Sequence, residues 1–347
     1  MASSGPFPRA PLALIVALAA SLLAGACVTQ GPKQPKPLGT TQLLERADSM
    51  FGARNTLETL EAYKLAAVSA QREGDGARFA EATAQVASVL ALSGQSVAAR
   101  SWLDQAQVAT SPEEPRAWSR VLLAHGLVLQ AEGSRALAHR EFELLWTLAL
   151  EMGHPDRAMQ AAWMASGTAP RADRLRWSQR CVEVARSTGN PRWEASALEG
   201  MAWVQDDLEM REEALISFHE SLALLTRTGS NHERLRAQWA LGRAQRLAGH
   251  THEARTTMEQ TLANAQQLLR TVFSPNDAEW VARCHGEMAE LCALDADFDA
   301  ALRHLRIART RYNQADAELL APEVLEVLDA RVRELQLEQA GLRSSSP

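Results

Sequence analysis

Residues 236–258 of the chain, RAQWALGRAQRLAGHTHEARTTM, carry the pattern that decides the fold. A small residue, Gly242, is followed seven positions later by a turn residue, Gly249. A second small residue, Ala254, comes five positions after the turn, and the bulky Met258 follows it. Two helices that meet at Gly249 can cross closely where each carries a small residue, whereas a larger side chain would separate them. The stretch therefore predicts a tightly packed helical hairpin.

The same pattern recurs six times along the chain. The small residues of the first helices are Ala87, Gly126, Ser166, Ala202, Gly242 and Ala289. Those of the second helices are Ala99, Ala138, Ser178, Ala214, Ala254 and Ala301, so both series have spacings of 39, 40, 36, 40 and 47 residues. A hairpin that recurs at a nearly constant period predicts a solenoid, in which each unit buries its apolar surface against its neighbours.

Length and composition agree with an all-α solenoid. A chain of 347 residues is longer than one compact core usually supports, but a solenoid is free of that limit. Hydrophobic residues make up 46% of the chain and aromatic residues only 5%, with many Ala and Leu, which favour helix. The net charge of −6 offers no basic excess for phosphates, which argues against nucleic acid as a partner.

Glycines and prolines predict where helices end. Gly153, Gly189 and Gly229 each end a second helix, and we expect left-handed backbone at all three. The longest spacing contains residues 273–276, which predicts a longer loop there. Outside the repeats of residues 77–318, we expect a diverged hairpin at 41–76 and a capping helix at 319–343.

The N-terminus predicts export. One basic residue precedes the apolar run LALIVALAASLLAG at 12–25, which is shorter than the ~20 residues that span a bilayer. We expect a signal peptide over residues 1–26, followed by a flexible tether with three prolines over residues 27–40.

The junction Leu23-Ala24-Gly25-Ala26-Cys27 resembles a bacterial lipobox. This resemblance implies cleavage before Cys27 and acylation of its thiol and amine, with palmitate-type chains that anchor the protein to a membrane. Val28 after the cysteine implies sorting to the outer membrane, with the repeats facing the periplasm. The alternative is an ordinary signal peptide cleaved near Ala26, which would leave a soluble periplasmic protein.

Over residues 80–312 the cassettes resemble tetratricopeptide repeats of the longer, ~40-residue kind. The resemblance implies a right-handed solenoid of about six to seven hairpins, with a groove lined by the first helices. Carried onto the clearest copy, the groove positions include Arg236, Trp239, Arg243 and Arg246, and Trp163 and Trp203 would line the same groove.

Spacing alone also places the three arginines and Trp239 on one helix face. They could hold a carboxylate or an acidic peptide. The alternative is internal pairing with Glu199, Asp206 and Asp207 at the equivalent positions of the preceding cassette.

The sequence predicts no catalytic site, cofactor or metal. His250 and His252 are read as solvated, and Cys181, Cys284 and Cys292 as small buried residues. We therefore expect a non-catalytic lipoprotein scaffold that binds an envelope protein or peptide. Lipidated repeat proteins of this kind resemble assembly factors of pili and secretion pores. The alternative is a partner of a solute-uptake system, because residues 47–63 weakly resemble the helical lipoprotein component of TRAP-type transporters.

Overall fold

The computed structural model describes residues 38–51, 56–271, 275–315 and 322–345. The expected signal peptide, Cys27 and most of the tether lie outside the described residues. Within the described part, no helix is both long enough and apolar enough to cross a membrane.

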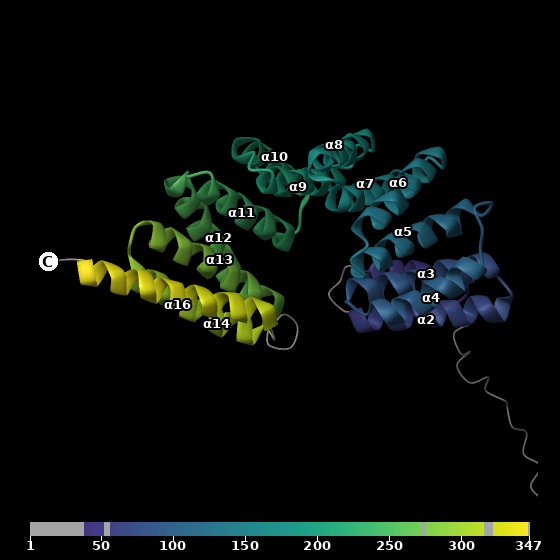
Figure 1. Ribbon diagram of the computed structural model, residues 1–347, viewed down its shortest axis with the longest axis horizontal. Coiled ribbons are helices and arrows are strands. Elements are labelled where there is room, and N and C mark those ends of the chain that lie inside the picture. The colour runs from purple at the N-terminus through teal and green to yellow at the C-terminus, as the bar shows by residue number, and fades with distance from the viewer. Residues whose placement is uncertain (1–37, 52–55, 272–274, 316–321, 346–347) are drawn as a thin grey trace, which may run out of the picture. The chain divides into compact units, whose positions relative to one another are not determined.

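The described residues form fifteen helices and no strand. Consecutive helices fold back on one another, and where the connection between them is described it is short (Figure 1). Their bounds are α1 Thr40–Met50, α2 Thr56–Glu73, α3 Gly76–Leu92, α4 Ser96–Val108, α5 Pro115–Ala131, α6 Arg135–Glu151, α7 Pro155–Thr168, α8 Arg171–Ser187, α9 Pro191–Asp207, α10 Arg211–Thr228, α11 Asn231–Leu247, α12 Thr251–Thr271, α13 Pro275–Leu294, α14 Phe298–Gln314 and α16 Pro322–Ser345.

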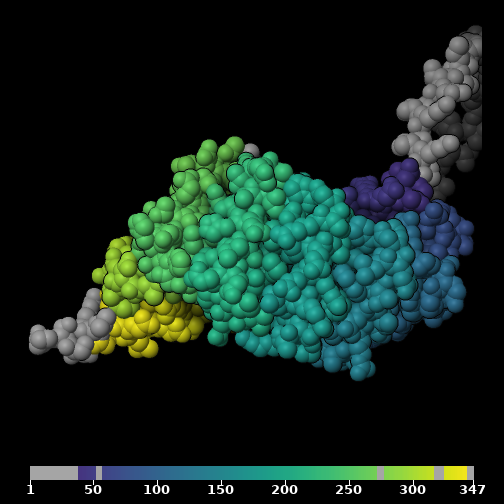
Figure 2. Space-filling model, turned by 90° about the horizontal axis from the view of Figure 1, so that it is seen from above, coloured from purple at the N-terminus to yellow at the C-terminus, as the bar shows by residue number. Residues whose placement is uncertain are grey.

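The six cassettes fall on six consecutive hairpins, from α3–α4 to α13–α14. Each first helix carries the first small residue of its cassette, and each second helix carries the other. Every helix packs against its neighbours in the chain, and the coloured segments follow one another in chain order (Figure 2). The prediction of an all-α solenoid of helical hairpins is confirmed.

The turn inside the hairpin uses left-handed backbone at the position seven residues after the small residue. Gly94, Gly133 and Gly249 have φ of 74°, 81° and 86° there. Glu209 and Ala296 occupy the same position with φ of 65° and 58°, although neither is glycine. The α7–α8 turn differs, because it passes through extended residues at Ala169 and Pro170.

The two helices of a hairpin also cross closely at the small residues, as the sequence predicts. A Cβ atom on Gly126 would lie 2.4 Å from the ring of Phe142 on α6. One on Gly242 would lie 2.9 Å from the terminal methyl of Met258. Ala202 is fully buried in a cluster with Phe218 and therefore fills this position in α9.

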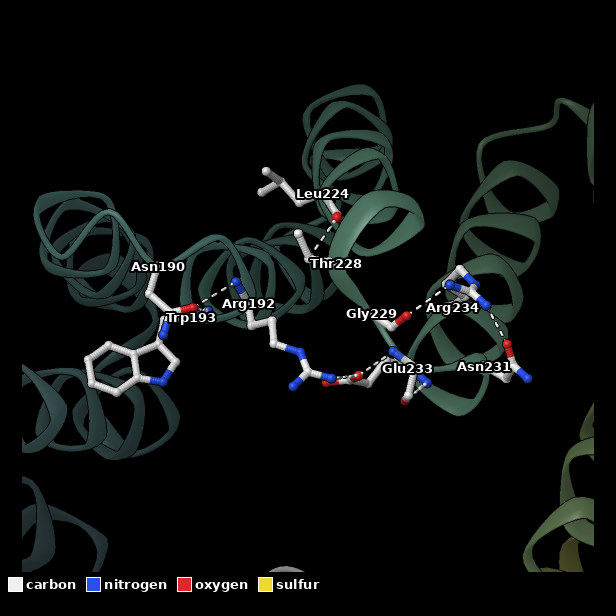
Figure 3. Close-up of polar contacts among 10 residues, drawn as sticks. Asn190, Arg192, Trp193, Leu224, Thr228, Gly229, Asn231, Glu233 and Arg234 are labelled. Carbon is white, nitrogen blue, oxygen red and sulfur yellow. Dashed lines mark hydrogen bonds and ion pairs between the residues drawn. The ribbon is translucent and has the colours of Figure 1, made fainter.

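Two expectations about connections are wrong. Gly229 is extended, with φ −83° and ψ 155°, because α10 ends without a left-handed turn and the chain runs straight to Ser230, the cap of α11. Ser230 and Glu233 form a capping box there. Figure 3 shows Gly229 and Glu233 at this connection. The longest cassette spacing does not come from a loop, because α12 and α13 take up the extra residues and are 21 and 20 residues long.

The hydrophobic core is continuous over the first nine helices and divided beyond them. One cluster of buried side chains runs from Leu44 of α1 to Leu198 of α9, and smaller clusters follow. The last cluster joins α13 and α14 to Leu328 and Leu335 of α16. Arg331 of α16 also donates two hydrogen bonds to Glu290 of α13, at 2.9 and 3.0 Å.

Candidate functional site

Three tryptophans form a row across the first helices α9, α11 and α13. The ring centroids of Trp203 and Trp239 are 6.2 Å apart, and those of Trp239 and Trp280 are 6.0 Å apart. All three side chains are partly exposed. The row therefore presents aromatic surface at the edge of three consecutive hairpins.

Two arginines lie over these rings. The guanidinium carbon of Arg243 is 5.3 Å from the centroid of Trp203. That of Arg283 is 5.4 Å from Trp239 and 5.3 Å from Trp280. These distances are within the range of cation–π contacts. We call this row with its arginines the Trp/Arg face; its members are Trp203, Arg236, Trp239, Arg243, Arg246, Trp280 and Arg283.

Arg236 pairs with the first helix of the preceding hairpin. Its guanidinium lies 2.9 Å from Glu199 of α9, whose side chain is almost fully buried, with 8% of the residue exposed. Burial raises the pKa of the Glu199 carboxyl, and the charge of Arg236 partly opposes that rise. The predicted alternative of internal pairing thus applies to Glu199. Asp206 and Asp207 pair elsewhere, with Arg211 and Arg174.

The other two arginines share one carboxylate of the following hairpin. Arg246 donates to Glu287 of α13 at 2.8 Å, and the guanidinium of Arg243 lies 3.5 Å from the same carboxyl group. Arg283 pairs with Glu279 at 2.8 Å. Because Glu287 serves two arginines, the four arginines of the face meet three carboxylates, which leaves an excess of positive charge.

Two donors in the face are buried without an acceptor among the described residues. They are the indole Nε1 of Trp239 and the Nε of Arg236. An unsatisfied buried donor costs about 1–3 kcal/mol. Unsatisfied groups of this kind tend to lie where function rather than stability decides the sequence.

Trp163 lies apart from this face. Its indole stands on α7, 44% exposed, and rests against the backbone of α9 at Gly200. It lines a pocket with Trp193 instead of joining the Trp203 row. The structure therefore brings together five of the six residues predicted for the groove and separates the sixth.

The groove positions expected from the sequence did not include Trp193, Trp280 or Glu287. A signal for the two tryptophans was present, because each precedes the small residue of its cassette by nine positions, at Ala202 and Ala289. Glu287 has no comparable signal. Within the described part of the chain, no group of three or more His, Cys, Asp or Glu side chains could hold a metal.

No family model matches this chain, and no curated protein is detectably similar to it in sequence. Solved structures of the same fold exist. The apo form of RapI is 11% identical, with a TM-score of 0.52 over 80% of this chain and 98% of that one. A tetratricopeptide repeat protein from Parabacteroides merdae is 12% identical, with a TM-score of 0.50 over 86% and 98% of the two chains.

A signal-transduction ATPase with a tetratricopeptide repeat sensor, from Pyrococcus horikoshii, has a TM-score of 0.60 at 11% identity. The match covers 84% of this chain and 44% of the ATPase. At such low identity these likenesses establish the tetratricopeptide-like fold.

Proposed function

We propose that this protein is a non-catalytic scaffold that binds a polypeptide partner through the Trp/Arg face. The observation that carries this proposal is the partly exposed row of Trp203, Trp239 and Trp280 with Arg243 and Arg283 over its rings. Tryptophan and arginine are the residues that contribute most binding energy at protein interfaces. Tetratricopeptide-like folds stack hairpins into extended surfaces suited to such contacts.

The charges of the face favour a partner with both apolar and acidic groups. Arg236 is tied to the buried Glu199 and is therefore a structural charge. Arg243 is held more loosely, at 3.5 Å from a carboxylate that also serves Arg246. A partner carboxylate can engage Arg243 without leaving a buried acid unpaired, so Arg243 is the arginine through which we expect recognition.

We further propose that the scaffold is anchored by lipid at Cys27 to the bacterial outer membrane and faces the periplasm. The apolar run at 12–25 and the lipobox-like junction before Cys27 support this location. A tethered binding surface there suits the assembly of an envelope structure such as a pilus or a secretion complex.

Site-specific photocrosslinking in the native envelope tests the function. A benzophenone amino acid at Trp239 should give a discrete crosslinked product in intact cells. The matched control is the same amino acid at Ile216, which is 60% exposed on the second helix α10. Arg243→Ala should weaken the Trp239 crosslink without changing the helical content.

The identity of the crosslinked partner distinguishes a role in envelope assembly from the alternative role in solute uptake. Pilus or secretion subunits would support the assembly role, whereas a solute-binding protein or permease would indicate the uptake alternative. Equal crosslinking at Ile216 and Trp239 would contradict the Trp/Arg face. In the same cells, Cys27→Ser should abolish labelling with palmitate and release the protein from the membrane; a Cys27→Ser form that stays membrane-bound would contradict the anchor.

A further inference from the structure

A pocket of about 320 Å³ lies between the first helices α7 and α9, separate from the Trp/Arg face. Its size is at the lower end of the roughly 300–1,000 Å³ typical of ligand pockets. Two indoles, a thioether, a methyl group and a thiol give it a largely apolar lining. The lining residues are Asp156, Met159, Gln160, Trp163, Cys181, Trp193, Ser196 and Ala197.

One wall of the pocket depends on the absence of a side chain at Gly200. A Cβ atom there would lie 1.7 Å from Cζ3 of Trp163, so the indole of Trp163 rests directly on the backbone of α9. Glycine inside a helix costs about 1 kcal/mol relative to alanine. Helix α9 therefore gives up intrinsic stability at the point where Trp163 forms the wall.

A second part of the wall is Trp193, in the first turn of α9. The side chain of Asn190 caps this turn by accepting hydrogen bonds from the backbone N–H groups of Arg192 and Trp193, at 3.0 and 3.4 Å. Arg192 reaches across to Glu233 of α11 at 2.7 Å, while the indole of Trp193 leaves the helix in another direction (Figure 3). The cap thus fixes the base of this part of the wall.

The thiol of Cys181 contributes an uncharged group to the lining. It is almost fully buried and donates to the carbonyl of Met159 at 3.5 Å. Burial raises the pKa of Cys181 to about 12, so the thiol stays neutral at physiological pH. The interior of the pocket therefore favours an apolar group over a charged one.

The charge that faces water at the rim is negative. The side chain of Asp156 is 52% exposed and lies 3.9 Å from Nδ1 of His154. The neighbouring Arg157 is largely turned into the protein, where it donates to Gln160 at 2.9 Å, and burial lowers its pKa to about 10. A ligand with an apolar group and an adjacent positive charge therefore fits the pocket and its rim.

We propose that this pocket binds one large apolar side chain of the partner polypeptide, next to a basic residue that faces Asp156. The proposal rests on the proposed function and specifies its partner. The exposed indole of Trp163, which would otherwise face water, is covered when the anchor side chain enters. Binding through both sites would join an apolar anchor at α7–α9 to acidic or aromatic contacts on the Trp/Arg face.

Fluorine NMR of the full-length protein labelled with 5-fluorotryptophan tests the pocket without any partner. The chain has nine tryptophans, and Trp163→Phe and Trp193→Phe assign the two resonances of interest. The probes are the capped dipeptides acetyl-Leu-Lys-amide and acetyl-Leu-Glu-amide. Both resonances should shift selectively with the Lys probe, at a dissociation constant of about 1–10 mM, as expected for a single anchoring side chain.

Variants separate the pocket from general effects on the fold. Gly200→Ala should displace Trp163 and weaken binding of the Lys probe at least about tenfold, equivalent to 1.4 kcal/mol. The matched control is Gly286→Ala in the interior of α13, where a Cβ would meet no described atom within 4 Å. Asp156→Asn should remove the preference for Lys over Glu. If Gly200→Ala alters the melting temperature, Trp163→Ala provides the second test.

Three outcomes would overturn the proposal. The first is the absence of a selective shift at Trp163 and Trp193. The second is unchanged binding in both Gly200→Ala and Trp163→Ala. The third is a shift of the Trp163 and Trp193 resonances when residues 28–38 are deleted. Such a shift would mean that the pocket holds the chain's own tether and not a partner side chain.

The Trp239 crosslink distinguishes failure of this proposal from failure of the proposed function. A crosslinked partner without probe binding would leave the function standing and overturn the pocket. Probe binding without any crosslinked partner would overturn both, because the pocket would then serve a ligand other than a partner side chain.

Discussion

Among the described residues, two that are not glycine hold the left-handed backbone that suits glycine better. Glu209 and Ala296 stand where Gly94, Gly133 and Gly249 form the same turn in other hairpins. A side chain in this region costs roughly 1–2 kcal/mol, because Cβ approaches a backbone carbonyl. The turn is nevertheless formed, so the packing of the two helices around it must offset that cost.

Glu209→Gly and Ala296→Gly should each raise the free energy of unfolding by about 1 kcal/mol, because glycine relieves the left-handed strain. Equilibrium urea denaturation followed by circular dichroism measures the change. The reverse substitution, Gly249→Ala, should lower stability by a similar amount. Identical midpoints for all three variants and the wild type would contradict the role of this position.

The two partners of the Glu199–Arg236 pair should respond differently to removal. Arg236→Ala leaves a buried carboxylate uncompensated and should cost about 2 kcal/mol. Glu199→Gln removes the buried charge and leaves the half-exposed Arg236 free to reach water, so it should cost little or be stabilising. Urea denaturation of both single variants and the double variant measures the coupling.

The raised pKa of Glu199 fixes the direction of its pH dependence. Between the pKa of Glu199 in the unfolded state and its higher pKa in the folded state, only the folded state keeps the carboxyl proton. Stability therefore falls as the pH rises through this range. Glu199→Gln should flatten that part of the stability curve. A larger loss of stability from Glu199→Gln than from Arg236→Ala would contradict this account.

At the scale of the helices, the small residue of each hairpin controls how closely the pair can cross. The neighbour of the missing Cβ differs between hairpins. At Gly126 it is the rigid ring of Phe142, with three ring atoms between 2.4 and 2.8 Å from the Cβ position. At Gly242 the nearest atom is the flexible end of Met258, at 2.9 Å, followed by Cγ2 of Thr257 at 3.3 Å.

Gly126→Ala should therefore lower stability by about 1–3 kcal/mol, because the ring cannot move without separating α5 from α6. Gly242→Ala should be nearly neutral, because the methyl of Met258 can turn away and alanine favours helix by about 1 kcal/mol. Thermal unfolding of both variants checks the ranking, and a greater loss from Gly242→Ala would refute it.

Helices α13 and α14 are joined by a pair of histidines. The Nδ1 atoms of His285 and His304 are 2.8 Å apart, so one ring donates and the other accepts. Burial, and then the charge of His304, lowers the pKa of His285 to about 4. Burial and the nearby Arg303 and Arg255 lower the pKa of His304 as well.

This pair should make the last hairpin sensitive to acid. Below pH 6.5 these histidines become protonated in the unfolded state but stay neutral in the folded state. Their contribution to the free energy of unfolding is therefore complete above pH 6.5 and is lost as the pH falls toward 4. We expect a loss of about 2 kcal/mol between pH 7 and pH 5. Hydrogen exchange of α13 and α14 measures it, and His285→Gln with His304→Gln should abolish the dependence.

At the scale of the whole molecule, each hairpin depends on its neighbours and the core is divided after α9. The buried cluster that begins at Leu44 ends at Leu198, and the later hairpins are held by smaller clusters. Stability in a stacked repeat is close to a sum of local terms and neighbour contacts. The two ends of the solenoid should therefore respond to damage separately.

A chain ending at Ala315 lacks α16 and its contacts through Leu328, Leu335 and Arg331. Hydrogen exchange in α13 and α14 should accelerate, because their apolar face loses its cover, while exchange in α3–α8 should stay unchanged. Mass spectrometry of the full-length and truncated chains measures both regions. Uniform acceleration along the chain would contradict independent ends.

The sequence by itself determined the hairpin and its repetition. The small residues, the turn and the bulky residue of each cassette lie within about twenty positions, so their spacing fixes how two consecutive helices pair. The same spacing placed Arg236, Trp239 and Arg243 on one helix face. Internal pairing of the arginines with Glu199 was also foreseen as an alternative, because Glu199 lies at a groove position of the preceding cassette.

Only the tertiary structure decided which side chains of different cassettes come into contact. Glu287 reaches Arg243 and Arg246 from a helix more than forty positions away, and Trp163 lies on Gly200 rather than beside Trp203. A period gives the order of the hairpins, but not the rotation of one hairpin against the next. That rotation depends on how side chains of neighbouring helices interdigitate. It determines that Trp203 lies in the Trp/Arg face and that Trp163 lines a separate pocket.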